Sequence, residues 1–138
     1  MKKSGILNAD LNAHISRLAH TDLFVVADSG FPVMPGIPIV DLRLVYGVPT
    51  FDQVFEAVLN EVEVEGGWLA SEMAEGNRAN YDLVTGTLHG LTLITHDGLK
   101  TLAHGARFVI RTGEDTPYSN VLLQSGVGFL VADAVSVT

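Results

Sequence analysis

Apolar runs of strand length alternate along the chain with segments of helical period. The run Leu23–Ala27 is uniformly apolar and stops at Asp28-Ser29-Gly30, which is typical of a buried strand. Thr50-Phe51-Asp52-Gln53 matches a capping box, and the apolar residues after it recur at helical spacing, which predicts a helix. The same patterns predict further strands at 39–46, 62–70, 91–95, 106–111 and 121–124, further helices at about 10–20, 80–88 and 97–104, and a proline-rich ordered loop at 31–38.

This alternation of strands and helices predicts an α/β domain around a largely parallel sheet. The last strand can close the sheet in the antiparallel direction. The length of 138 residues corresponds to one domain.

The composition predicts that more apolar surface is buried than one small core can hold. Hydrophobic residues make up 47% of the chain, whereas charged residues make up 17%, below the roughly 25% of an average soluble domain. Apolar surface is therefore expected to remain after the core is filled, and its burial between subunits predicts a homo-oligomer.

The charge pattern bears on the possible partners. Eight basic and 16 acidic residues give a net charge of −8, which repels phosphate backbones and anionic lipid surfaces. We therefore expect no nucleic-acid partner and no membrane association. The chain has no cysteine, no apolar run of membrane-spanning length and no signal peptide, so a cytoplasmic protein is expected.

Polar residues follow the predicted strands, where α/β proteins commonly bind ligands. Asp28 ends the first strand, His96 follows the strand at 91–95, and a polar segment at 112–120 follows the strand at 106–111. His20 lies just before the first strand. A histidine can exchange a proton near neutral pH, and carboxylate, amide and phenol groups can orient hydroxyl groups.

The same residues also admit purely structural roles. His20 could complement a helix dipole and Asp28 could cap a turn, while His96, Tyr118 and Asn120 could be ordinary helix-start and turn residues. Close pairs of metal ligands and a glycine-rich phosphate loop with a lysine are both missing from the sequence. Chemistry without a metal or cofactor is therefore expected.

Several segments in unbroken order resemble the ribose pyranase and fucose mutarotase family. They are His20-Thr21-Asp22, Asp28-Ser29-Gly30-Phe31-Pro32, Gly47-Val48-Pro49 and Gly113-Glu114-Asp115-Thr116-Pro117-Tyr118-Ser119-Asn120, together with residues 7–11 and 16–19. The resemblance extends from Met1 to about Phe129. It implies a domain over 1–129, followed by an extension of unknown role over 130–138.

The resemblance implies a cofactor-independent isomerase that interconverts the β-pyranose and β-furanose forms of D-ribose and supplies the furanose for phosphorylation. It implies that His20 is the catalytic proton donor and that Asp28, His96, Tyr118, Ser119 and Asn120 bind the sugar. It further implies a three-layer α/β/α fold with a mixed, mostly parallel sheet, and pentameric rings stacked as decamers with sites at subunit boundaries. An L-fucose mutarotase and a non-catalytic monosaccharide-binding module remain the alternatives.

Overall fold

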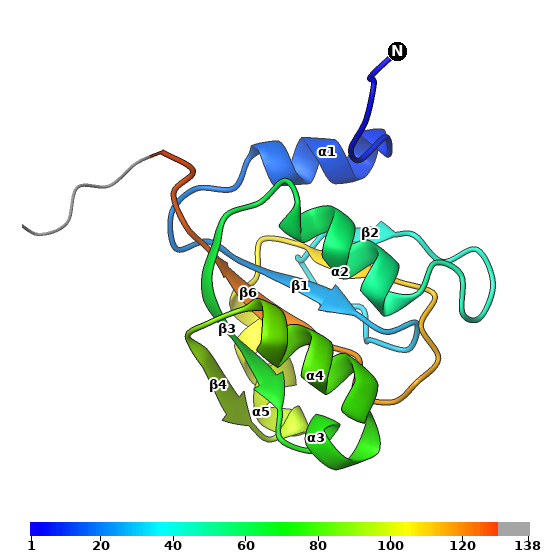
Figure 1. Ribbon diagram of the computed structural model, residues 1–138, viewed down its shortest axis with the longest axis vertical. Helices are drawn as coiled ribbons and strands as arrows, with labels where there is room; N and C mark the ends of the chain where they lie inside the picture. Colours follow the sequence, from blue (N-terminus) through cyan, green and yellow to red (C-terminus); the bar gives the residue numbers. More distant parts are fainter. Residues whose placement is uncertain (130–138) are drawn as a thin grey trace, which may run out of the picture.

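A computed structural model describes residues 1–129 of the protein (Figure 1). The predicted extension at 130–138 lies outside the described residues. The domain boundary at residue 129 therefore stays a prediction.

The centre of the molecule is one six-stranded sheet in the order β2-β5-β1-β6-β3-β4. Strand β6 pairs antiparallel with both of its neighbours, whereas the other pairs are parallel. This confirms the mixed, mostly parallel sheet and the antiparallel closing strand. The strands are β1 (Leu23–Ala27), β2 (Ile39–Asp41), β3 (Val64–Ala70), β4 (Leu91–Ile94), β5 (Val109–Arg111) and β6 (Val121–Ser125).

Helices cover both faces of the sheet and confirm the three-layer α/β/α arrangement (Figure 1). One face carries α1 (Ala9–Ser16), α2 (Phe51–Leu59), α3 (Met73–Gly76) and α4 (Arg78–Thr87). The other face carries α5 (His96–Leu102), the 3₁₀ turn Ala103–Gly105 and the proline-rich loop.

Both faces of β1 are covered, which explains why its sequence is apolar at every position. Phe24 and Val26 face the core beneath α2, whereas Val25 and Ala27 face the core beneath α5. All four are fully buried. Successive side chains of a strand point to opposite faces, so a strand covered on both faces is apolar throughout.

The structure differs from the sequence prediction at two places. The predicted strand at 39–46 ends at Asp41, because residues 42–48 leave the sheet as a hairpin with Leu44, Val45 and Tyr46 exposed to solvent. The run of apolar side chains fits the pattern of a strand, but no strand of the sheet pairs with these residues. The four-residue helix α3 was not predicted, because so short a segment shows less than two helical turns of pattern.

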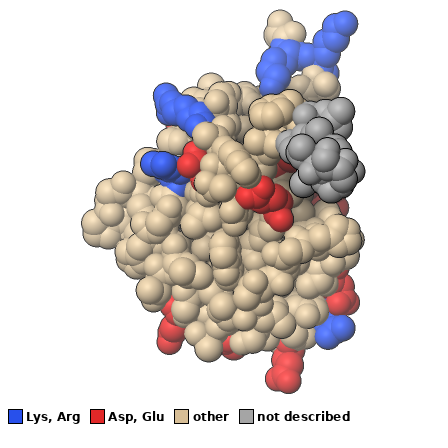
Figure 2. All heavy atoms as spheres, turned by 90° about the vertical axis from the view of Figure 1, so that its left-hand side faces the viewer, with Lys and Arg blue, Asp and Glu red and all other residues tan. Residues whose placement is uncertain are grey.

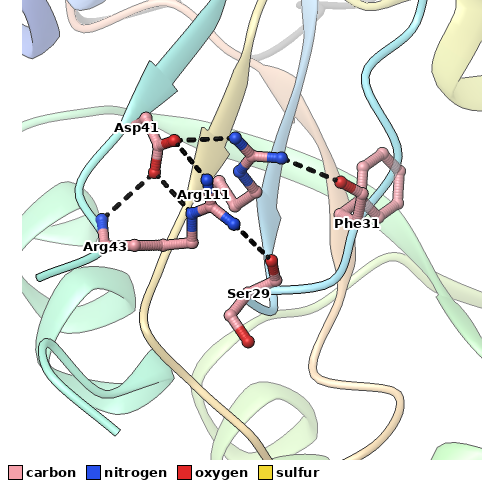
Figure 3. Close-up of polar contacts among 5 residues, drawn as sticks. All are labelled: Ser29, Phe31, Asp41, Arg43 and Arg111. Atoms are coloured by element: carbon pink, nitrogen blue, oxygen red, sulfur yellow. Dashed lines mark hydrogen bonds and ion pairs between the residues drawn. The ribbon is translucent and has the colours of Figure 1, made fainter. Parts of the chain in front are cut away.

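Asp41 ties β2 and β5 to the loop that follows β1 (Figure 3). Its carboxylate accepts hydrogen bonds from the guanidinium groups of Arg43 and Arg111 at 2.7–2.8 Å. The two arginines in turn donate to the main-chain oxygens of Ser29 and Phe31. These bonds hold the pKa of Asp41 far below its usual range, chiefly through Arg43. The loop after Asp28 is therefore fixed to the neighbouring strands.

Candidate functional site

Asp28 and Asn120 meet at the carboxyl end of β1. The Asn120 side-chain Oδ1 accepts a hydrogen bond from the Asp28 main-chain N–H at 2.8 Å, and its Nδ2 donates to Asp28 Oδ2 at 3.2 Å. Asn120 is 1% exposed and lies directly before β6. Two residues that are 92 positions apart in sequence thus form one reciprocal pair, because β1 and β6 are adjacent and antiparallel.

The Asp28 carboxyl lies in a partly dehydrated environment. Burial raises its pKa, since removal from water disfavours the charged form, while hydrogen bonds from Asn120 and the Gly30 main chain and the nearby His96 and Lys100 act in the opposite direction. A raised pKa beside several hydrogen-bond donors is typical of a functional carboxyl.

His96 and Tyr118 lie against each other next to this pair. Their rings are 5.2 Å apart in an edge-to-face arrangement, and the Nδ1 atom of His96 is buried with no hydrogen-bond partner among residues 1–129. The His96 main-chain N–H donates to Glu72 Oε2 at 2.8 Å, which fixes the start of α5. An unpaired buried nitrogen costs free energy unless a ligand or water satisfies it.

Tyr118 has an unusual backbone conformation. Its φ is +62°, a region that non-glycine residues rarely occupy. A Cβ at Gly76 would lie 3.0 Å from the Tyr118 ring, so the glycine leaves room for that ring. Strained residues of this kind are common at binding sites, where the surrounding structure holds them in place.

Ser119 lies in the same segment, but its hydroxyl is fully used inside the protein. It donates to the Thr116 main-chain oxygen at 2.9 Å and accepts from Asn77 and Asn80 at 2.6 and 3.1 Å. A hydroxyl has one donor and two lone pairs, so no capacity remains for a ligand. A contact between Ser119 and a sugar would have to use the main chain.

A hollow of about 230 Å³ opens over this end of the sheet. It is lined by Asp28, Ser29, Gly30, Tyr46 and the segment 114–117. This volume is below the ~300–1,000 Å³ of sites for drug-sized ligands, and it suits a smaller molecule. The exposed hairpin reaches the hollow through Tyr46, because Gly113 lets the hairpin backbone approach: a Cβ there would lie 2.7 Å from the Val48 nitrogen.

His20 and Asp28 lie at opposite ends of β1, the strand labelled near the centre of Figure 1. It belongs to the turn before β1, whereas Asp28 follows β1. At about 3.3 Å per residue, the five residues of the strand keep them roughly 15 Å apart. Within one chain, the structure therefore brings together Asp28, His96, Tyr118 and Asn120 but not His20.

Sequence reasoning missed several polar residues around the candidate site residues, among them Asn77 and Asn80 beside Ser119. Glu72 accepts from the His96 main chain, and this bond is the main reason that its pKa is lowered. Glu65 accepts a hydrogen bond from His20, and Gln124 donates to Glu65. The adjacent glycines at 66 and 67 are the one sequence signal near Glu65, since glycine inside a strand often marks a bulge.

Comparison with known proteins places this geometry in a family. A model of the RbsD / FucU transport protein family matches residues 1–128. The chain belongs to this family. A D-ribose pyranase of Corynebacterium glutamicum is 46% identical over 129 residues, which cover 94% of this chain and 100% of that protein. A D-ribose pyranase of Cutibacterium acnes is 43% identical with the same coverage.

A solved structure of the RbsD / FucU family agrees with the fold. The structure of Bacillus subtilis RbsD complexed with D-ribose superposes with a TM-score of 0.86 at 39% identity, over 94% of this chain and 100% of that one. Among residues 1–129, no helix is long and apolar enough to cross a membrane, and no three His, Asp or Glu side chains are grouped to hold a metal ion.

Proposed function

We propose that the protein interconverts the β-pyranose and β-furanose forms of D-ribose. The observation that carries the proposal is the near-complete match to D-ribose pyranases and to a ribose-bound relative. It is combined with a small hollow that the Asp28 side of the site lines. The product furanose would be the substrate of a ribose kinase, and we place the reaction in the cytoplasm, where that kinase has ATP.

Asp28, Asn120 and His96 offer the groups that a monosaccharide requires. The Asp28 carboxylate can accept a hydrogen bond from a sugar hydroxyl, and the buried Nδ1 of His96 can be satisfied by another. Tyr118 adds an aromatic edge and a phenol, and Asn120 holds the carboxylate in place. We assign binding to these side chains and to the Ser119 main chain.

The reaction needs only proton transfers. Ring opening removes the proton of the anomeric hydroxyl, forms the carbonyl, breaks the bond between C1 and the ring oxygen O5, and protonates O5. Closure then joins O4 to C1, with the O4 proton removed and the carbonyl oxygen protonated again. We assign His20 to protonate O5, and His96 or a water held by Asp28 to handle the anomeric hydroxyl.

The separation of His20 from Asp28 supports a site shared between two copies of the chain. We propose that His20 of one subunit lies over the Asp28 end of another, in pentameric rings stacked as decamers. Leu44, Val45, Tyr46 and Val48 expose 45–83% of their surface, which is typical of a surface that a partner covers. The hairpin that carries them is the cyan loop on the right of Figure 1, whereas Figure 2 shows the left-hand side of the molecule, on which uncharged side chains also predominate.

Saturation-transfer proton NMR tests the proposed reaction directly. D-ribose is observed with and without the protein, with L-fucose as a parallel sample. We expect transfer between the pyranose and furanose anomeric signals of D-ribose only when the protein is present. Exchange in L-fucose alone would assign the protein as a fucose mutarotase. Exchange in neither sugar, together with saturable binding of ribose, would indicate a non-catalytic binding module.

A further inference from the structure

A chain of side-chain hydrogen bonds ends at His20. His20 Nε2 lies 2.9 Å from Glu65 Oε2, and the other carboxylate oxygen of Glu65 accepts from Gln124 Nε2, also at 2.9 Å. Each oxygen of the carboxylate therefore has its own partner, and the orientation of the carboxylate is set by Gln124. The His20 side chain is 54% exposed and that of Glu65 is 37% exposed.

A β-bulge places Glu65 in this position. Val64 pairs with Ser125 and Gly66 pairs with Gln124, so Glu65 is the extra residue of β3 opposite β6. A bulge changes the direction of a side chain and is common next to functional sites. The glycine at position 66 lets the turn before β4 approach β3 beside the bulge, because a Cβ there would lie 2.8 Å from the Gly90 main-chain oxygen.

The turn that carries His20 is fixed on both sides. The Ala19 main-chain N–H donates to Asp22 Oδ2 at 2.9 Å, and the Thr21 N–H donates to the Ser125 main-chain oxygen at 2.8 Å. Thr21 has φ of +70°, so these bonds hold a conformation that a threonine rarely adopts. The backbone under His20 is thus attached to β6, the strand that also carries Gln124.

We propose that Glu65, oriented by Gln124, is a positioning residue that holds the His20 imidazole for proton transfer. This inference rests on the proposed function of His20. Exposed ion pairs contribute little to folding stability, so stability does not account for a bulge and two matched hydrogen bonds at this place. Their common effect is to fix the direction of one imidazole ring.

The contact also determines which ring nitrogen meets the sugar. A carboxylate only accepts hydrogen bonds, so Nε2 keeps its proton toward Glu65 and Nδ1 is the nitrogen left to exchange protons. In ring opening, Nδ1–H passes its proton to O5 as the C1–O5 bond breaks. In closure, Nδ1 takes the proton of O4 as the C1–O4 bond forms. His20 is returned to its starting state, and no other reactant is consumed.

Two measurements on full-length variants test the positioning role. The first records the ring nitrogens of His20 by ¹⁵N NMR without sugar, in the wild type and in Glu65→Ala. The second measures ribose exchange in Glu65→Ala, Glu65→Gln and Gln124→Ala. Glu63→Ala is the matched control, because Glu63 is an exposed glutamate two residues away whose side chain forms no hydrogen bond within residues 1–129.

In the neutral His20 ring of the wild type, we expect two well-separated ¹⁵N signals, one from the protonated Nε2 and one from the unprotonated Nδ1. In Glu65→Ala the two signals should move toward each other, because the two tautomers then interconvert. We expect kcat to fall about tenfold in Glu65→Ala, less in Gln124→Ala, and to recover partly in Glu65→Gln, with KM and Tm unchanged. Glu63→Ala should match the wild type.

The outcomes separate this inference from the proposed function. A wild type that exchanges ribose, an inactive His20→Ala and a fully active Glu65→Ala would overturn the positioning role and leave the function intact. A change confined to KM, or unchanged ring-nitrogen signals, would also overturn it. A wild type that exchanges neither sugar would overturn the function and the positioning role with it.

Discussion

The two ends of the central sheet are built on different principles. At the carboxyl end of β1, Asn120 is buried and its hydrogen bonds to Asp28 join segments 92 residues apart. At the other end, His20 and Glu65 are partly exposed to solvent, on a turn and a bulge. Groups at the first end are part of the folded core, whereas groups at the second are attached to its rim.

This difference predicts how each end responds to mutation. Removal of a buried, paired group leaves its partner unsatisfied and lowers the free energy of unfolding. Removal of an exposed group changes stability little, so its effect is seen in chemistry alone. The same contrast separates binding from proton transfer in the proposed mechanism.

The largest effect is expected at the exposed end. His20→Ala should reduce ribose exchange by about 10²- to 10⁴-fold, the usual contribution of a general acid or base, with no change in Tm. His89→Ala, which removes another exposed histidine, should retain full activity.

A mixing experiment extends this comparison to the subunits. His20→Ala and Asp28→Ala are each inactive by the proposed mechanism. If the site is shared, co-expression of the two restores part of the activity, because some boundaries combine an intact His20 with an intact Asp28. Failure to restore any activity, in mixed oligomers verified by mass spectrometry, would contradict the shared site.

A smaller effect on activity but a larger effect on stability is expected at the buried end. Asn120→Ala leaves the Asp28 N–H and Oδ2 without their partner, which should lower the free energy of unfolding by about 1–3 kcal/mol. Weaker ribose binding should accompany it. Urea unfolding and a ribose titration measure the two, with the exposed Asn60→Ala as the control. If Asn120→Ala left the free energy of unfolding unchanged, the Asp28 end of the sheet would not differ from the His20 end in its contribution to stability.

The features of the fold and the site that could be predicted from the sequence are those set by residues close together in the chain. Strand β1 and helix α2 were predicted closely, because an apolar run and a capping box are local signals. The positions of His20 and Asp28 at the ends of the first predicted strand made them candidates, and the resemblance supplied their roles. Their separation follows from the strand between them. The bulge at Glu65 could not be predicted, because it depends on the register of β3 against β6, strands that lie 50 residues apart.

The smallest effect expected is a difference in pH dependence between two aspartates, one at each end. Asp22 beside His20 has its pKa lowered, first by the hydrogen bond from the Ala19 main chain and further by Arg107, with burial opposing them. Asp28 has its pKa raised, first by burial, with its hydrogen bonds opposing the shift. Because the causes partly cancel in each case, the net effects on stability are modest.

The two shifts have opposite consequences for the free energy of unfolding. The contribution of Asp22 is present above the unfolded pKa of about 3.9 and is lost as the pH falls through the lower folded value. That of Asp28 is fully present below about 3.9 and is lost as the pH rises through the higher folded value. Unfolding of Asp22→Asn and Asp28→Asn between pH 3 and 6 should therefore give differences from the wild type that change in opposite directions with pH. Slopes of the same sign would mean that the Asp28 carboxyl is hydrated in solution and that the two ends do not differ as described.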